Sequence, residues 1–175
     1  MIEQVIQGIL LALHNMALVG CAAAPFYNRN LVRARAQYGS KLFYELDKVV
    51  EDTLQGNAPY CLALLAVMVV TGIGMPLNHY LFHGAFKTLH PVAVTALVLK
   101  LGFLTGMVVI MIRIFFGLNP RLKEIFARFN PGQEPPADEV KEFFEKRAQR
   151  KALCETCLKF AIGVLVCSAF LGFGS

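Results

Sequence analysis

Apolar residues occur along this chain in four long runs that are separated by polar and charged segments. The runs cover residues 5–25, 58–78, 91–117 and 154–173. An α-helix rises about 1.5 Å per residue, so about 20 apolar residues cross the roughly 30 Å hydrocarbon core of a bilayer. The pattern therefore predicts an all-α integral membrane protein that folds as a four-helix transmembrane bundle.

Composition supports the same class. Hydrophobic residues make up 56% of the 175 residues, and the mean hydropathy is +0.53. A soluble domain of this size is normally less apolar. We expect residues 1–175 to form a single transmembrane domain in a lipid bilayer.

The first charged segment, residues 26–57, separates the first two runs. We expect Pro25 to end the first span, because proline interrupts helical hydrogen bonding. Apolar residues recur at helical spacing over residues 42–54, which predicts an interfacial amphipathic helix at the membrane edge. Pro59 then opens the second span, and residues 78–90 form a short connection to the third.

The second charged segment, residues 118–153, precedes the fourth run. A short basic helix is expected over residues 121–129, and the Pro- and Gly-rich residues 130–137 indicate a linker. We expect residues 138–153 to form a charged helix that continues without a break into the fourth span. This part is the cytoplasmic helical extension of the predicted fold.

Lys and Arg are distributed unevenly between these segments. Residues 26–57 contain five, residues 118–153 contain eight, and the connection after the second run contains only Lys87. The positive-inside rule therefore places both charged segments in the cytoplasm. We expect a multi-pass protein of the bacterial inner membrane with both termini on the periplasmic side. The net charge of +5 reflects this topology, so we expect no nucleic-acid partner.

Two ionisable residues interrupt the apolar runs at matching depths. Lys100 lies nine residues into the third run, and His14 lies nine residues into the first. Both runs descend from the outside, so the two side chains share a layer near mid-membrane. A buried ammonium costs at least about 2.5 kcal/mol, so Lys100 is expected to face the interior and to have a partner. Either the pair forms an interior functional site, which we favour, or it only orients the helices.

Three histidines cluster near the outer end of the bundle: His79, His83 and His90. His79 and His83 are four residues apart, so they share one face of a helix, as paired metal ligands require. The interpretation that we favour is a set of solvated loop histidines, since no Asp or Glu lies nearby in the sequence to complete a metal site.

Four cysteines fall near the cytoplasmic ends of the runs: Cys21, Cys61, Cys154 and Cys157. Four thiolates are able to bind zinc or an iron–sulfur cluster. Cysteine is also a small core residue, however, and the cytoplasm keeps thiols reduced. We expect these four to be reduced and to bind no metal.

The chain resembles the HemJ/CopD-type four-helix membrane proteins, which include the HemJ protoporphyrinogen oxidases. The resemblance depends on His14 in LLALHNMALVG, Lys100 in ALVLKLGFL and the basic segment EKRAQRKALCETC. Glu155 corresponds to the acidic residue of an Asn-Glu-x-Pro motif in that family, although the Asn and the Pro are missing here. The Pro-Arg pair that follows the first helix in that family is Pro25-Phe26 in this chain.

The resemblance implies haem b, with His14 and Lys100 as the catalytic residues. His14 is then an axial ligand or hydrogen-bond partner, Met68 or Met107 is a candidate second ligand, and Lys100 is a candidate partner for a propionate. These residues form the predicted cofactor-binding set.

Three functions remain open at this point. The first is a haem-associated redox protein, either a HemJ-like oxidase or an electron-transfer subunit. The second is a non-catalytic structural or assembly subunit, as a homo-oligomer or within a larger membrane complex. The third is a metal-handling, CopD-like protein that uses the outer histidines. The sequence does not decide whether the protein is an enzyme.

Overall fold

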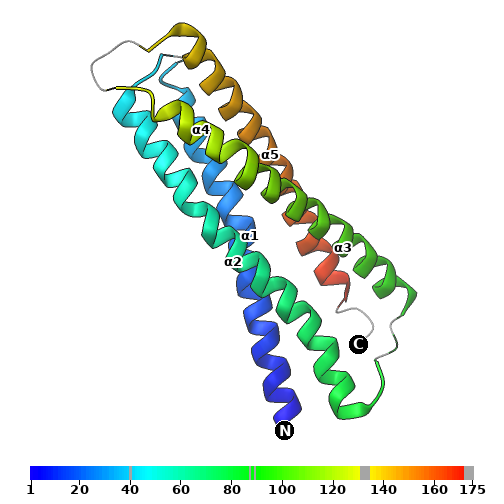
Figure 1. Cartoon of the computed structure of the whole chain (residues 1–175). Helices are drawn as coiled ribbons and strands as arrows, with labels where there is room; N and C mark the ends of the chain where they lie inside the picture. The colour runs from blue at the N-terminus through cyan, green and yellow to red at the C-terminus, as the bar shows by residue number, and fades with distance from the viewer. Residues whose placement is uncertain (40, 87, 89, 131–134, 172–175) are drawn as a thin grey trace.

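The computed structural model describes residues 1–39, 41–86, 88, 90–130 and 135–171. Every regular element in this part of the chain is helical (Figure 1). The elements are α1 (Ile2–Ala36), α2 (Tyr44–His83), α3 (Pro91–Ile112), the π-helix η1 (Arg113–Leu118), α4 (Asn119–Phe126) and α5 (Ala137–Leu171). Half of the predicted linker over residues 130–137, namely residues 131–134, lies outside the described residues.

Four helical stretches are long and apolar enough to cross a membrane: α1, α2, the continuous stretch Pro91–Phe126, and α5. Each has about 35 to 40 residues. At about 1.5 Å per residue, each is longer than the hydrocarbon core is thick. The prediction of an all-α chain with four helices able to span a membrane is confirmed.

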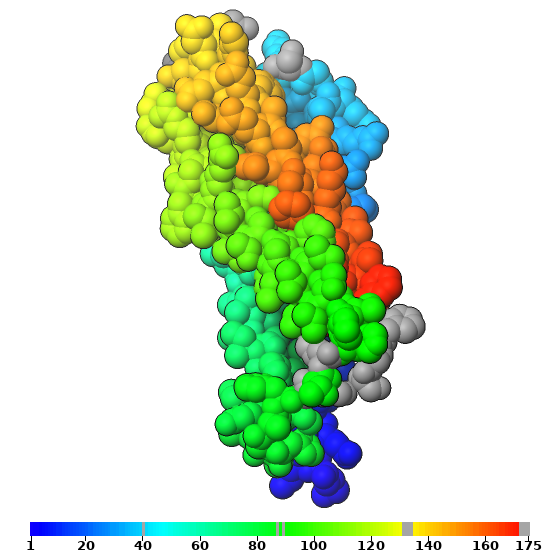
Figure 2. All heavy atoms as spheres, turned by 90° about the vertical axis from the view of Figure 1, so that its right-hand side faces the viewer, coloured from blue at the N-terminus to red at the C-terminus, as the bar shows by residue number. Residues whose placement is uncertain are grey.

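The four long helices form two antiparallel pairs. Helix α1 packs along α2, helix α3 packs along α5, and α1 also contacts α5. The two pairs meet at one end and diverge toward the other (Figure 1). We call the first the charged end, where α1 finishes, α2 and α5 begin and α4 lies. The second is the histidine end, where the first turns of α1 and the last turns of α2 form one tip (Figure 2).

The predicted break at Pro25 is wrong, because α1 continues through it to Ala36. Residues 42–54 likewise do not form a separate amphipathic helix, since from Tyr44 onward they are the first turns of α2. Pro59 and Pro76 both lie inside α2. A proline removes one hydrogen bond, but in apolar surroundings an interrupted helix would expose many more unsatisfied backbone groups.

Two further boundaries differ from the prediction. Residues 78–83, expected in a connection, are the last turns of α2, which ends at Gly84 in a left-handed conformation (φ 67°). At the end of α3 the chain widens into η1 and continues into α4, whose second residue is Pro120. Proline lacks the N–H for an i→i−4 bond and clashes with the preceding turn, which accounts for the wider turn before it.

Close contact between α3 and α5 depends on two glycines. A Cβ atom on Gly106 would overlap the ring of Phe160, and one on Gly163 would lie 2.8 Å from the ring of Phe103. Each phenylalanine therefore fills the space that a glycine leaves on the opposite helix. Gly102 lies one turn before Gly106 on α3 but has nothing within 4 Å of such an added atom, so it does not serve this helix contact.

A buried network of charges joins four helices at the charged end. Asp47 of α2 is fully buried and accepts hydrogen bonds from Arg35 of α1, at 2.7 Å, and from Arg147 of α5. Glu51, one turn further along α2, accepts a hydrogen bond from Arg150 at 2.6 Å. Arg150 also donates to the side chain of Asn119 of α4, at 3.3 Å.

The environment of Asp47 changes its titration. Burial alone would raise the pKa of this carboxyl, but hydrogen bonds from Arg35, Arg147 and the backbone N–H of Phe43 outweigh burial and lower it. Because the folded-state pKa lies below the ordinary value of 3.8, this stabilisation is complete at neutral pH. It is lost only as the pH falls below that value toward the folded-state pKa.

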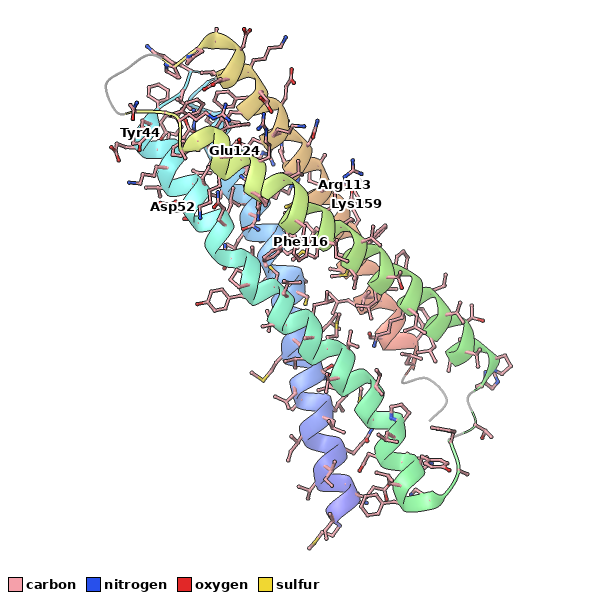
Figure 3. The ribbon with its side chains drawn as sticks, viewed as in Figure 1. Tyr44, Asp52, Arg113, Phe116, Glu124 and Lys159 are labelled. Atoms are coloured by element: carbon pink, nitrogen blue, oxygen red, sulfur yellow. The ribbon has the colours of Figure 1, made fainter. Side chains whose placement is uncertain are left out.

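Asp47→Asn is expected to lower the free energy of unfolding by about 3–5 kcal/mol, because it leaves two buried guanidinium groups without their shared anion. Thermal unfolding of the purified protein in an uncharged detergent measures this. Asp52→Asn is the matched control, since Asp52 is exposed on the same helix (Figure 3). Equal melting temperatures for the two variants would show that the network does not hold the helices together.

Candidate functional site

His79 and His83 lie side by side on the last turns of α2, with their ring centroids 4.4 Å apart. This is the arrangement that their i,i+4 spacing predicts. Both rings are partly open to solvent, with side-chain exposures of 34% for His79 and 52% for His83. An ion or a solute can therefore reach both rings from water.

A carboxylate from α1 completes this group. Glu3 Oε1 lies 3.0 Å from His83 Nε2 and 3.6 Å from His79 Nδ1. One donor atom from each of the three residues lies within 4.8 Å of the other two. The expectation that no acidic residue is near these histidines is wrong. Glu3 is distant in sequence, and only the pairing of α1 with α2 brings it here.

Asn78 holds α1 against α2 beside this group. Its side-chain amide donates to Gln7 Oε1 at 3.2 Å and to the backbone oxygen of Glu3 at 3.3 Å, and only 6% of the residue is exposed. A buried polar group without a partner costs free energy, so this contact favours one register of the two helices. Glu3 is thereby placed level with His79 and His83.

Two imidazole nitrogens and one carboxylate oxygen are a donor set that Zn²⁺ and similar transition metals accept. Three protein ligands leave a coordination position open, as in exchangeable and catalytic sites rather than closed structural ones. The third predicted histidine, His90, does not belong to this group, because it is exposed at the N-cap of α3.

His14 and Lys100 meet in the interior, as their matching depths predict. Lys100 Nζ lies 3.2 Å from His14 Nε2, and His14 Nδ1 lies 3.0 Å from Thr71 Oγ1. Thr71 donates its hydroxyl hydrogen to the backbone oxygen of Val67 at 2.6 Å. Thr71 is therefore the acceptor for Nδ1–H of His14, and Nε2 accepts from Lys100.

This arrangement does not fit His14 as an axial ligand of haem, because both ring nitrogens already have partners. Met68 and Met107, the candidate second ligands, are each 2% exposed and pack in the apolar core between the helix pairs. The expectation of bound haem thus depends on the resemblance to HemJ/CopD-type proteins alone. What the geometry shows is a hydrogen-bonded bridge by which Lys100 of α3 reaches His14 of α1.

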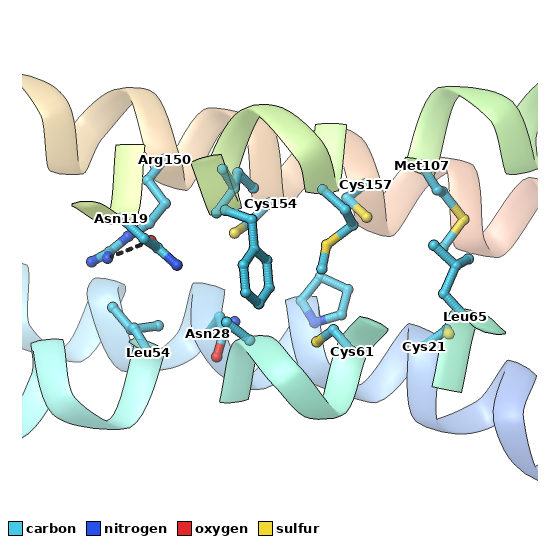
Figure 4. Close-up of a pocket in the computed structure, with 15 residues that line it drawn as sticks. Cys21, Asn28, Leu54, Cys61, Leu65, Met107, Asn119, Arg150, Cys154 and Cys157 are labelled. Carbon is cyan, nitrogen blue, oxygen red and sulfur yellow. Dashed lines mark hydrogen bonds between the residues drawn. The ribbon is translucent and has the colours of Figure 1, made fainter. Parts of the chain in front are cut away.

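The four predicted cysteines line one small cavity, together with Leu65 and Met107 (Figure 4). Its volume is about 50 Å³, which is space for a few water molecules. All five cysteines of the chain are free thiols. Among the described residues, no three of their sulfurs approach one another closely enough to share an ion. Glu155, the acidic residue of the resemblance, lies 3.6 Å from Arg29 in a half-exposed ion pair.

The chain matches no protein-family model, no curated protein and no solved structure in comparisons with each. The resemblance to HemJ/CopD-type proteins is neither supported nor contradicted by these comparisons. Function is therefore inferred from the geometry of the Glu3/His79/His83 group and of the His14/Lys100 pair.

The partners of His14 predict that the purified protein shows no Soret band that depends on this residue. Wild type and His14→Ala, expressed with added haem precursor, are compared by visible absorption. Thr71→Val serves as a second variant, because it frees Nδ1 without removing the ring. A Soret band in wild type that disappears in His14→Ala would contradict the prediction and support haem ligation.

Proposed function

We propose that this protein is a multi-pass membrane protein that handles a divalent transition metal, which it binds at its histidine end. The observation that carries the proposal is the convergence of Glu3, His79 and His83 from two helices within 4.8 Å. Metal handling was one of three functions left open by the sequence, and this is the one for which the geometry provides a donor set.

The membrane in this proposal surrounds the apolar half of the bundle. Helix α3 has 22 residues, so it is about 33 Å long, close to the thickness of the hydrocarbon core. Exposed apolar side chains such as Val70, Val98 and Val166 cover the outward faces of the helices. At the inner end of this region, Arg113, Phe116 and Lys159 lie at one level along the bundle (Figure 3). Aromatic and cationic side chains favour the membrane interface.

The charged end, which carries the basic segments, is on the cytoplasmic side in this proposal. This orientation is tested by introducing cysteines with Phe86→Cys and Asp52→Cys and labelling them with a maleimide that does not cross membranes. We expect labelling of Phe86→Cys in intact cells and labelling of Asp52→Cys only after lysis. The wild type is the control, because its cysteines are buried or half-buried. The reverse pattern would place the metal site in the cytoplasm and contradict the proposed orientation.

The three donor atoms narrow the choice of metal ion. Imidazole and carboxylate ligands suit Zn²⁺, Cu²⁺ and Ni²⁺, whereas Mg²⁺ and Ca²⁺ prefer all-oxygen sites. The site lies at the tip of the molecule and is partly open to water, so an ion is able to enter and leave without passing through the bundle. An accessible site with an open coordination position fits capture and transfer of an ion.

Full-length protein stripped of metal, in an uncharged detergent, is expected to bind one Zn²⁺ per chain by isothermal titration calorimetry. Glu3→Gln, His79→Ala and His83→Ala each remove one ligand. Loss of an outer hydrogen-bond partner alone weakens metal binding about 10- to 100-fold, so each of these variants is expected to weaken it at least tenfold.

His90→Ala is the matched control, because it removes an exposed histidine of the same end without touching the donor set. Its affinity for Zn²⁺ should equal that of the wild type. If His90→Ala weakened binding as much as His83→Ala, or if the wild type bound no stoichiometric Zn²⁺, the proposed site would be wrong.

A further inference from the structure

A groove at the charged end lies between the last turns of α1 and the first half of α5, at the opposite end of the molecule from the proposed metal site. Its volume is about 390 Å³. It is lined by Val32, Arg35, Ala36, Gly39, Phe144, Arg147, Ala148 and Lys151. The lining residues include three cations and no acidic residue among the described residues.

The charge behind the groove is also unbalanced. Three buried guanidinium groups, of Arg35, Arg147 and Arg150, face two buried carboxylates, of Asp47 and Glu51. One positive charge is therefore left in excess. Buried charge without a counterion is costly, so this excess favours an anion at the nearest place that an anion can reach. The groove is such a place, because Arg35 and Arg147 both line it.

Arg147 also has hydrogen-bonding capacity left over. It is 3% exposed, yet its Nε and Nη2 atoms have no hydrogen-bond partner, although Nε lies 3.4 Å from Glu51 Oε1. Lys151 follows Arg147 by four residues on α5 and so lies on the same face of the helix. Both Arg147 atoms are buried and Nε faces Glu51, so Arg147 contributes its positive charge to the groove rather than a free N–H group. Lys151, which also lines the groove, adds an ammonium that can donate to an oxyanion.

We propose that this groove binds the phosphate group of a phosphorylated organic molecule. Arg35, Arg147 and Lys151 supply the positive field, and Val32, Ala36 and Phe144 form an apolar wall for the organic part. The volume exceeds what a bare phosphate needs. Two kinds of molecule offer such a phosphate group: an anionic phospholipid, through its headgroup, and a soluble phosphate ester. The site is independent of the proposed metal function.

The experiment uses full-length protein and measures its melting temperature and its affinity by calorimetry. In the soluble arm, inorganic phosphate is titrated into protein in an uncharged detergent, against sodium chloride at equal ionic strength. In the lipid arm, the protein is placed in bilayer discs of phosphatidylcholine with or without phosphatidylglycerol. Lys151→Ala is compared with Lys141→Ala, an exposed lysine of α5 outside the groove.

We expect phosphate, phosphatidylglycerol or both to raise the melting temperature of the wild type and of Lys141→Ala. Lys151→Ala should lower the affinity for the phosphate group about tenfold, since it removes one charge-assisted hydrogen bond. If the melting temperature rises with only one of the two, that ligand identifies whether the phosphate group comes from a soluble ester or from a lipid headgroup. No response in either arm, or equal responses of Lys151→Ala and Lys141→Ala, would overturn the proposal.

A charge reversal tests the same site without any ligand. Lys151→Glu places a carboxylate one turn from Arg147, where it substitutes for the proposed anion. This variant should melt at a higher temperature than the wild type in phosphate-free buffer and should lose the response to phosphate. Lys141→Glu should do neither. A Lys151→Glu variant that melted no higher than the wild type would show that the groove does not require an anion.

Discussion

The buried pairing of Asp47 with Arg35 and Arg147 is the interaction on which the arrangement of the helices depends. Charges without partners are costly inside a protein, so each member must find the others before the charged end closes. Because α1 and α2 are continuous rods, the register set there extends along both helices. Glu3 and Arg35 are 32 residues apart on α1, and Asp47 and His79 are 32 residues apart on α2, a distance of about 48 Å in each helix. The contact that closes the charged end thus also positions the carboxylate beside the histidines.

Much of the fold could be predicted from the sequence, because four apolar runs of spanning length have few alternatives. The meeting of His14 with Lys100 was predictable too, since residues at equal depth on neighbouring helices are within reach. Pro25 and Pro59 misled the prediction of the helix boundaries, because they interrupt hydrogen bonding locally but an apolar environment favours an unbroken helix. Glu3 could not be identified as a partner of His79 and His83, because its role depends on the register of two helices and on no local pattern.

The two ends of the molecule combine polar groups in different ways. At the histidine end, three donors converge at a surface that water reaches, as reversible ion binding requires. In the interior, hydrogen bonds from Thr71 through His14 to Lys100 connect the two helix pairs. At the charged end, the excess of guanidinium groups over carboxylates leaves a positive field beside an open groove. The two proposed ligand sites thus lie at opposite ends of the molecule, and the hydrogen bonds of His14 lie between them.

X-ray absorption at the zinc edge, on full-length protein loaded with one Zn²⁺, identifies the atoms that bind the ion. We expect two imidazole nitrogens and a carboxylate oxygen at about 2.0–2.2 Å, with water in the remaining position, and loss of the carboxylate in Glu3→Gln. Sulfur neighbours at about 2.3 Å would assign the ion to the cysteines instead. That result, or a shell made of water alone, would contradict a metal site built from Glu3, His79 and His83.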